Sequence, residues 1–148
     1  MKLAAYPFIK RPGTYYYEFY SKGPKGSIKK VVEYYKLREL KAEVYNLAFG
    51  DWDEDKHHIN DLSISNNADR DKVLATVAAT VADFMKVHPD AIILASGSTL
   101  SRTRLYQISI ARLWDNIEPH FEIQGYINDN WQPFQKGVNY IAFILKAR

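Results

Sequence analysis

Side chains that can bind an anion gather in one short stretch of the chain, directly after a run of apolar residues. The run ends at Ala95, Gly97 supplies a turn, and a helix-like segment follows. The first turn of a helix offers backbone N–H groups, and hydroxyl and guanidinium groups add further donors for an anion. We therefore predict a binding site for a phosphate or carboxylate group here. Its candidate ligands are Gly97, Ser98, Thr99, Arg102 and Arg104.

The two arginines occupy an unfavourable place in the expected helix, 99–117. At 100° per residue the apolar side chains of this helix form one stripe, and Arg102 lies about 40° from it. The positive end of the helix dipole disfavours both arginines in the first turn. A bound anion would offset that cost, and this is the main physical reason to predict binding at this end. The stripe consists of Tyr106, Ile110, Leu113 and Ile117.

A structural role for Arg102 is an equally strong alternative. A carboxylate on the adjoining sheet, such as Glu18, Glu33 or Asp61, would hold its guanidinium group in an ion pair. Structural ion pairs perturb such sites as often as ligands do, so the residue types alone leave both interpretations open.

Two more polar candidates, Lys136 and Asn139, flank Gly137 in a segment that leads into the last predicted strand. Their side chains could face a pocket, but a turn with a positive φ at glycine explains the segment equally well. His120 is a further acid–base candidate, although a helix length separates it from Gly97.

Other familiar site patterns are incomplete. Asp51, Asp53 and Asp55 begin like a calcium-binding loop, but the glycine at position six and the glutamate at position twelve are missing. The glycine-rich nucleotide-binding patterns and the GxSxG nucleophile motif do not occur. We therefore predict no metal site, and the sequence indicates neither a catalytic residue nor a cofactor.

The tyrosine-rich amino-terminal half combines aromatic and basic residues, as many nucleic-acid-binding surfaces do. The acidic segment 51–61 follows closely, so a continuous basic face is not assured and a nucleic-acid partner stays an open alternative. The lysines concerned are Lys22, Lys25, Lys29 and Lys30.

The elements that position these residues predict a single α+β domain over 1–148. Alternating and β-branched segments indicate an antiparallel meander of four strands, 14–21, 28–37, 44–51 and 59–65. A helix capped by Asn67 or Asp69 and ended by His88 follows, then a buried strand, 91–95, so a parallel pair is expected. The helix 99–117 and the strands 121–127 and 140–146 complete a mixed, largely antiparallel sheet with two main helices.

Composition places the chain among soluble folded proteins. It has 148 residues, a formal net charge of +3 and no cysteine, and 47% of its residues are hydrophobic. The absence of cysteine fits a reducing cytoplasm, and no signal-peptide pattern or membrane-spanning run occurs. We expect a cytoplasmic protein without a membrane partner.

Three segments together resemble a family of small uncharacterised bacterial proteins. They are GSTxxRTRLY at 97–106, FEIxG at 121–125 and KGVNYxAF at 136–143, and the resemblance covers most of the chain. It implies no activity, but it directs attention to Thr99, Arg102, Arg104, Tyr106, Lys136 and Asn139 as a group.

The order of elements is also similar to the second half of GNAT-type N-acetyltransferases. In that superfamily the fourth strand leads into a glycine-containing loop that binds pyrophosphate. The corresponding segment here, 66–71, contains no glycine. The similarity concerns topology, which is a weak argument for function.

The function that these observations favour is a small binding or regulatory module that holds an anionic small molecule or a protein partner at 97–104. A place in a toxin–antitoxin or defence cassette is a further hypothesis. One alternative is an acetyltransferase-like enzyme with a degenerate cofactor loop. Another is a homodimer whose seam includes Leu105 and Ile108, which lie outside the main stripe of the helix, with structural arginines.

Overall fold

The computed structural model describes residues 4–60, 67–97 and 99–148. Within them, three helices pack on a mixed, mostly antiparallel sheet of nine strands, which confirms the predicted α+β class. The helices are α1 (Arg70–Val87), α2 (Leu100–Arg112) and α3 (Trp114–Ile117). The strands are β1 (Ile9–Lys10), β2 (Tyr16–Gly23), β3 (Gly26–Lys36), β4 (Val44–Asp53), β5 (His58–Asn60), β6 (Ile92–Ala95), β7 (Phe121–Ile127), β8 (Asn130–Pro133) and β9 (Ala142–Ala147).

The strands follow the order β1-β2-β3-β4-β6-β9-β7-β8, and β5 pairs with the end of β4. Only β4 and β6 pair in parallel among the described strands. Because β3 occupies one edge of β4, strands β6 and β5 share the other edge, at 44–46 and 51–53 respectively. The intervening segment, 47–50, therefore has no neighbouring described strand on that edge.

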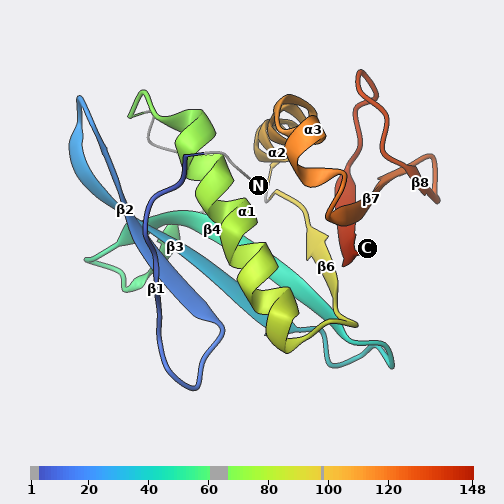
Figure 1. Ribbon diagram of the computed structural model, residues 1–148, viewed down its shortest axis with the longest axis horizontal. Coiled ribbons are helices and arrows are strands. Elements are labelled where there is room, and N and C mark those ends of the chain that lie inside the picture. Colours follow the sequence, from blue (N-terminus) through green and yellow to red (C-terminus); the bar gives the residue numbers. More distant parts are fainter. Residues whose placement is uncertain (1–3, 61–66, 98) are drawn as a thin grey trace.

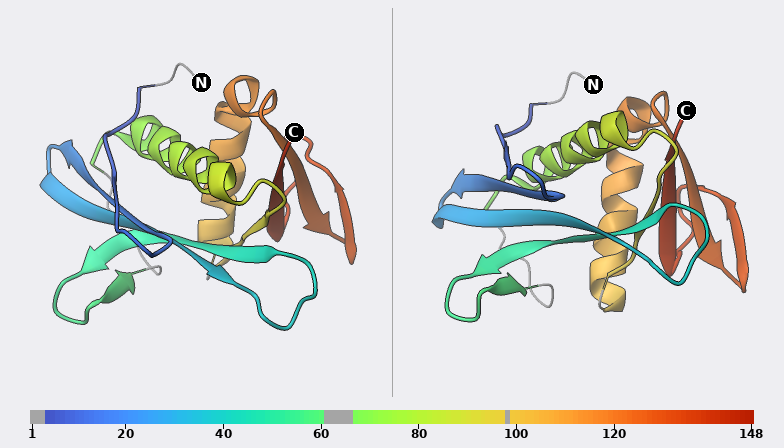
Figure 2. Two further views of the ribbon diagram at one scale, coloured as in Figure 1. Left: turned by 60° about the horizontal axis from the view of Figure 1, so that its bottom comes forward. Right: turned by 90° about the horizontal axis from the view of Figure 1, so that it is seen from below.

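Helix α1 lies over one face of the sheet, whereas α2 runs crosswise to α1 and passes the edge of β4 (Figure 2). Helix α1 crosses β2, β3 and β4 diagonally, and α2 leads through α3 toward β7 (Figure 1). The strongly twisted sheet curves around α1, and its opposite face along β2–β4 carries no helix (Figure 2). We call this uncovered side the outer face.

Strand alternation and helical periodicity account for the core between these layers. On β2, the side chains of Tyr17 and Phe19 face the helices and are at most 1% exposed, whereas their neighbours face outward. The buried stripe of α1 has the predicted helical spacing, and near its end the carbonyl of Phe84 accepts the backbone N–H of the C-cap residue His88. The stripe contains Val73, Leu74, Val81, Phe84 and Met85.

Several element boundaries differ from those that the sequence predicts. The predicted helix 99–117 is broken at Leu113, which adopts φ −97° and ψ 9° between α2 and α3. The break turns Leu113 and Ile117 into the core, where they are 7% and 5% exposed. The described part of the predicted strand 59–65 belongs to β5, and 61–66 lie outside the described residues. The sequence predicts that 91–95 pairs in parallel with the strand just before α1, whereas the structure pairs β6 in parallel with β4.

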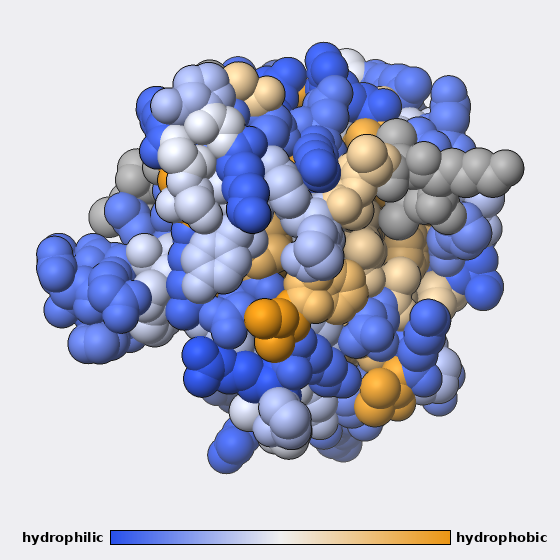
Figure 3. Space-filling model, turned by 60° about the vertical axis from the view of Figure 1, so that its left-hand side comes forward, coloured by the Kyte–Doolittle hydropathy of each residue, from blue (hydrophilic) through white to orange (hydrophobic). Residues whose placement is uncertain are grey.

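The described helices include none that is both long and apolar enough to cross a membrane. The face of the molecule drawn in Figure 3 is largely hydrophilic, with a limited hydrophobic band near its middle. Isolated apolar side chains on such a surface are ordinary for folded proteins.

Candidate functional site

The turn between β6 and α2 is closed by its own hydroxyl groups. Gly97 N donates to Thr103 Oγ1 at 3.0 Å, and this hydroxyl donates to Thr99 O at 3.1 Å. Thr99 Oγ1 caps the helix by accepting Arg102 N at 3.2 Å. A Cβ at position 97 would lie 2.4 Å from Thr103 N, so the turn requires glycine. Ser98 lies outside the described residues.

The side chain of Arg102 is turned into the protein, where only 5% of the residue is exposed. Its Nη2 donates to the carbonyl oxygen of Phe49. Phe49 lies in the segment of β4 between its pairings with β6 and β5, where no described strand reaches the carbonyl. Arg102 therefore attaches the start of α2 to the edge of β4 and has a structural role.

The structure shows no ion pair between Arg102 and the predicted carboxylates among the described residues. Glu18 pairs with Lys29 at 2.9 Å and with Arg11 at 3.6 Å. Asp61 lies outside the described residues. A backbone carbonyl, rather than the carboxylate of Glu18, is thus a partner that the structure shows for Arg102.

The remaining candidates on α2 point in different directions. Arg104 is exposed on the side of the helix away from the core. Tyr106 is half-buried and follows Arg102 by one helical turn, on the face that packs toward α1 and the sheet. The junction therefore brings Gly97, Thr99 and Arg102 together, whereas Tyr106 packs toward the core and Arg104 is exposed to solvent near the start of the helix.

Lys136 and Asn139 lie on the exposed segment between β8 and β9. Gly137 has φ +85°, which supports the predicted turn. The segment is joined to α2 through Tyr140 N, which donates to Gln107 Oε1 at 3.4 Å. This contact lies more than one helical turn beyond Arg102, so the structure gives no contact that adds Lys136 or Asn139 to the junction.

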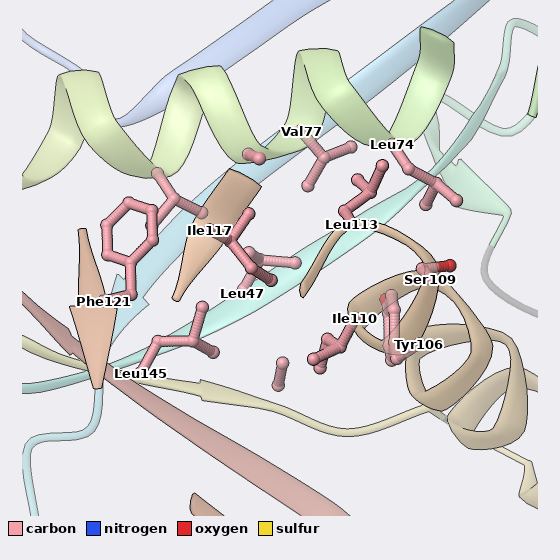
Figure 4. A pocket seen from close by; sticks show the side chains of 13 residues that line it. Leu47, Leu74, Val77, Tyr106, Ser109, Ile110, Leu113, Ile117, Phe121 and Leu145 are labelled. Atoms are coloured by element: carbon pink, nitrogen blue, oxygen red, sulfur yellow. The ribbon is translucent and has the colours of Figure 1, made fainter. Parts of the chain in front are cut away.

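An apolar cavity lies between α1, α2 and the sheet (Figure 4). Its volume is about 90 Å³. Ser109 is the one serine or threonine in the lining. Its hydroxyl group donates to the backbone oxygen of Leu105, so it presents no unsatisfied donor to the cavity. The walls include Leu47 of β4, Leu74 and Ala78 of α1, Tyr106 and Ile110 of α2, and Leu145 of β9.

Sequence reasoning missed this cavity because each of its walls has the signature of an ordinary core position. The lining comes from β4, β6, β7, β9 and all three described helices, which only the folded chain brings together. Ala95, at the end of β6, is both a cavity wall and the second residue before Gly97. The cavity and the predicted anion site are therefore adjacent.

The start of α1 is occupied by structural contacts. Asp69 takes the N-cap position without a side-chain bond to the helix, and its carboxylate instead accepts hydrogen bonds from the hydroxyl groups of Tyr6 and Ser21. Burial raises the pKa of Tyr6, and the bond to Asp69 adds to that effect. Asn67 is 2% exposed and holds the β2–β3 turn, accepting Lys25 N at 2.7 Å.

One of the four lysines predicted for a basic surface does not belong to it. Lys30 is 1% exposed and forms an ion pair with Asp51, its register partner on β4. Lys29 lies on the outer face, with its Nζ 5.2 Å from the ring centre of Trp52. Strand alternation separates these two neighbours, so the expectation of a surface lysine is wrong at position 30.

Comparison with known proteins identifies the family. Residues 2–148 match the family described as "Family of unknown function (DUF6934)". The chain belongs to this family. No curated protein and no solved structure matches it. Membership in DUF6934 agrees with the resemblance to uncharacterised proteins, whereas the similarity to N-acetyltransferases stays a prediction.

Proposed function

We propose that this DUF6934 protein is a small ligand-binding module whose ligand places an apolar group in the cavity between α1 and α2. The observation that carries the proposal is the cavity itself, with its apolar walls and a volume of about 90 Å³. Natural cores contain few voids larger than a water molecule. An engineered apolar cavity of about 150 Å³ stays dry and binds benzene, so a smaller cavity of the same character is expected to accept a short hydrocarbon chain, or a ring if its walls relax.

The energetic cost of an unfilled cavity supports this proposal. Residual cavity volume in protein cores costs about 24 cal/mol per Å³, so about 90 Å³ corresponds to about 2 kcal/mol. One larger side chain at Ala78 would recover part of this. The chain instead keeps alanine at this wall, as expected where a ligand fills the space.

We further propose that the β6–α2 junction binds a carboxylate or phosphate group of the same ligand. In support, the first turn of α2 contains no acidic residue, and Arg104 is exposed beside it. Arg102 fixes the helix start through its bond to Phe49 and so positions the backbone N–H groups of that turn. Lys136 and Asn139 stay predicted ligands of such a group.

Thermal unfolding with benzene and benzoate tests both parts. We expect benzene to raise the melting temperature of the protein, and benzoate to raise it more because its carboxylate reaches the junction. Ala78→Leu should raise the melting temperature without ligand and abolish both ligand effects. The matched control is Ala79→Leu, on the same helix outside the cavity lining.

Two results would contradict these proposals separately. If benzene stabilises neither the wild type nor Ala79→Leu, the cavity is not a ligand site. If benzoate stabilises no more than benzene, and Arg104→Met changes neither effect, the junction does not bind the anionic group. Each failure leaves the other part standing, because the two readouts depend on different residues.

The acetyltransferase alternative gains no support at the start of α1. A cofactor pyrophosphate there would meet the carboxylates of Asp69 and Asp71, and like charges repel. The homodimer alternative has one supporting observation, since Leu100 and Ile108 of α2 are 61% and 45% exposed. Light scattering separates a dimer from the 17.1 kDa monomer. Co-expression with neighbouring genes would test the predicted toxin–antitoxin or defence role.

A further inference from the structure

The outer face of the sheet carries a second hollow, which is lined by aromatic side chains and one carboxylate. Tyr16, Glu33 and Ala48 lie directly opposite one another on β2, β3 and β4. Tyr35 and Trp52 complete the walls, and the volume is about 410 Å³. We call this set the aromatic hollow. Helix α1 lies over the other face of these strands, and the hollow shares no lining residue with the apolar cavity, so the two sites are separate (Figure 2).

The rings form walls at steep angles to one another. Tyr16 and Trp52 have ring centres 6.5 Å apart and planes at 86°. Tyr35 is 46% exposed, so its ring is accessible from solvent. The small side chain of Ala48 leaves room between these rings. Aromatic faces carry a negative quadrupole charge that attracts cations, and several rings around one space bind alkylated ammonium groups.

Glu33 makes the hollow more than an aromatic patch. Its carboxylate is half-buried, and no described residue forms an ion pair or hydrogen bond with it. Burial is the main cause that raises the pKa of Tyr16, and the charge of Glu33 acts in the same direction. A partly desolvated carboxylate without a partner costs free energy that a bound cation would recover.

The two basic groups nearby do not satisfy this carboxylate. Lys29 and Arg11 lie over the rings of Trp52 and Tyr16, at 5.2 and 5.1 Å from the ring centres. Both pair with Glu18, and neither lines the hollow. These contacts show that the same rings already attract cations, while Glu33 lines the hollow without an ion pair to any described residue.

We propose that the aromatic hollow binds an alkylated ammonium group, with Tyr16, Tyr35 and Trp52 around the cation and Glu33 as its counter-ion. Alkylation matters because bare ammonium is strongly hydrated, whereas methyl groups pack on rings and weaken the hydration shell. His57 and His58 also line the hollow.

Titration with tetramethylammonium, followed by the ring-current shift of its methyl protons, tests the proposal. We expect saturable binding and at least tenfold weaker binding of ammonium. Glu33→Gln should weaken binding about fivefold, and Tyr35→Leu about threefold. The controls are Glu122→Gln on β7 and Tyr20→Leu, another exposed tyrosine on β2 outside the hollow, and both should leave the affinity unchanged.

Absence of saturable binding to the wild type, or equal affinity of Glu33→Gln and the wild type for tetramethylammonium, would overturn the proposal. If Glu33→Gln fails to fold, the affinity of Tyr35→Leu supplies the same test. A comparison of the affinities for choline and for a trimethyllysine-containing peptide then identifies the source of the group. Tighter binding of choline indicates a free small molecule, and tighter binding of the peptide indicates a modified protein. Ala78→Leu should not affect tetramethylammonium, so failure here is distinguishable from failure of the cavity proposal.

Discussion

Replacement of Arg102 by methionine tests whether this arginine holds the start of α2 on the sheet. Methionine keeps an unbranched apolar stem but removes the guanidinium bond to the Phe49 carbonyl. Hydrogen bonds from charged donors contribute about 1.5–3 kcal/mol, and a buried acceptor left without a partner costs about 1–3 kcal/mol. Because Arg102 is only 5% exposed, water cannot easily replace it. We expect the free energy of unfolding to fall by about 2–3 kcal/mol.

Urea unfolding followed by tryptophan fluorescence measures this change, and Arg104→Met is the matched control. Arg104 lies on the same helix two residues later and is exposed, so its loss should change stability by no more than about 0.5 kcal/mol. For a chain of 148 residues, the Arg102→Met effect corresponds to a drop in melting temperature of about 5–10 °C. Equal effects of the two substitutions would refute the structural role of Arg102.

Three further changes probe the fold around the site. Gly97→Ala should cost about 2 kcal/mol in chemical unfolding, because its Cβ would meet backbone atoms of α2, and an unchanged midpoint would contradict that. The bond from Arg112 lowers the pKa of Asp71, so the ionised carboxylate stabilises the fold slightly above its ordinary pKa of 3.8. Asp71→Asn should therefore reduce the free energy of unfolding slightly above that pH, and the difference from the wild type should disappear as the pH falls below it. A difference that persists in acid would contradict this prediction. Burial raises the pKa of Tyr34, so stability should fall as pH rises above 10.0, and less so in Tyr34→Phe than in the wild type.

Local periodicity explains which parts of the fold could be predicted from the sequence. The stripe from Val73 to Phe84 requires only helical spacing and a break at His88, and both are present in α1. Element order also predicts a parallel pair across α1, since a helix must intervene between two such strands, but it does not predict that the partner of β6 is β4. The break at Leu113 has no glycine or proline to indicate it, because it depends on packing of that side chain in the core.

The sites depended on contacts that sequence spacing does not encode. The residue types draw attention to Arg102 as an anion ligand or an ion-pair partner, but they do not indicate its bond to the carbonyl of Phe49, whose availability depends on where β5 and β6 end. The apolar cavity consists of positions that each look like core. Glu33 was considered only as a partner for Arg102, because nothing in the sequence places it beside Tyr16 and Ala48.

The most direct test of the proposed binding function is a crystal structure of the protein equilibrated with benzene. The account predicts density for the ring between α1 and α2, in contact with Leu47, Ile110 and Leu145 and absent from Ala78→Leu crystals. A structure of the wild type in which benzene is absent and the surrounding side chains have closed the cavity would contradict it.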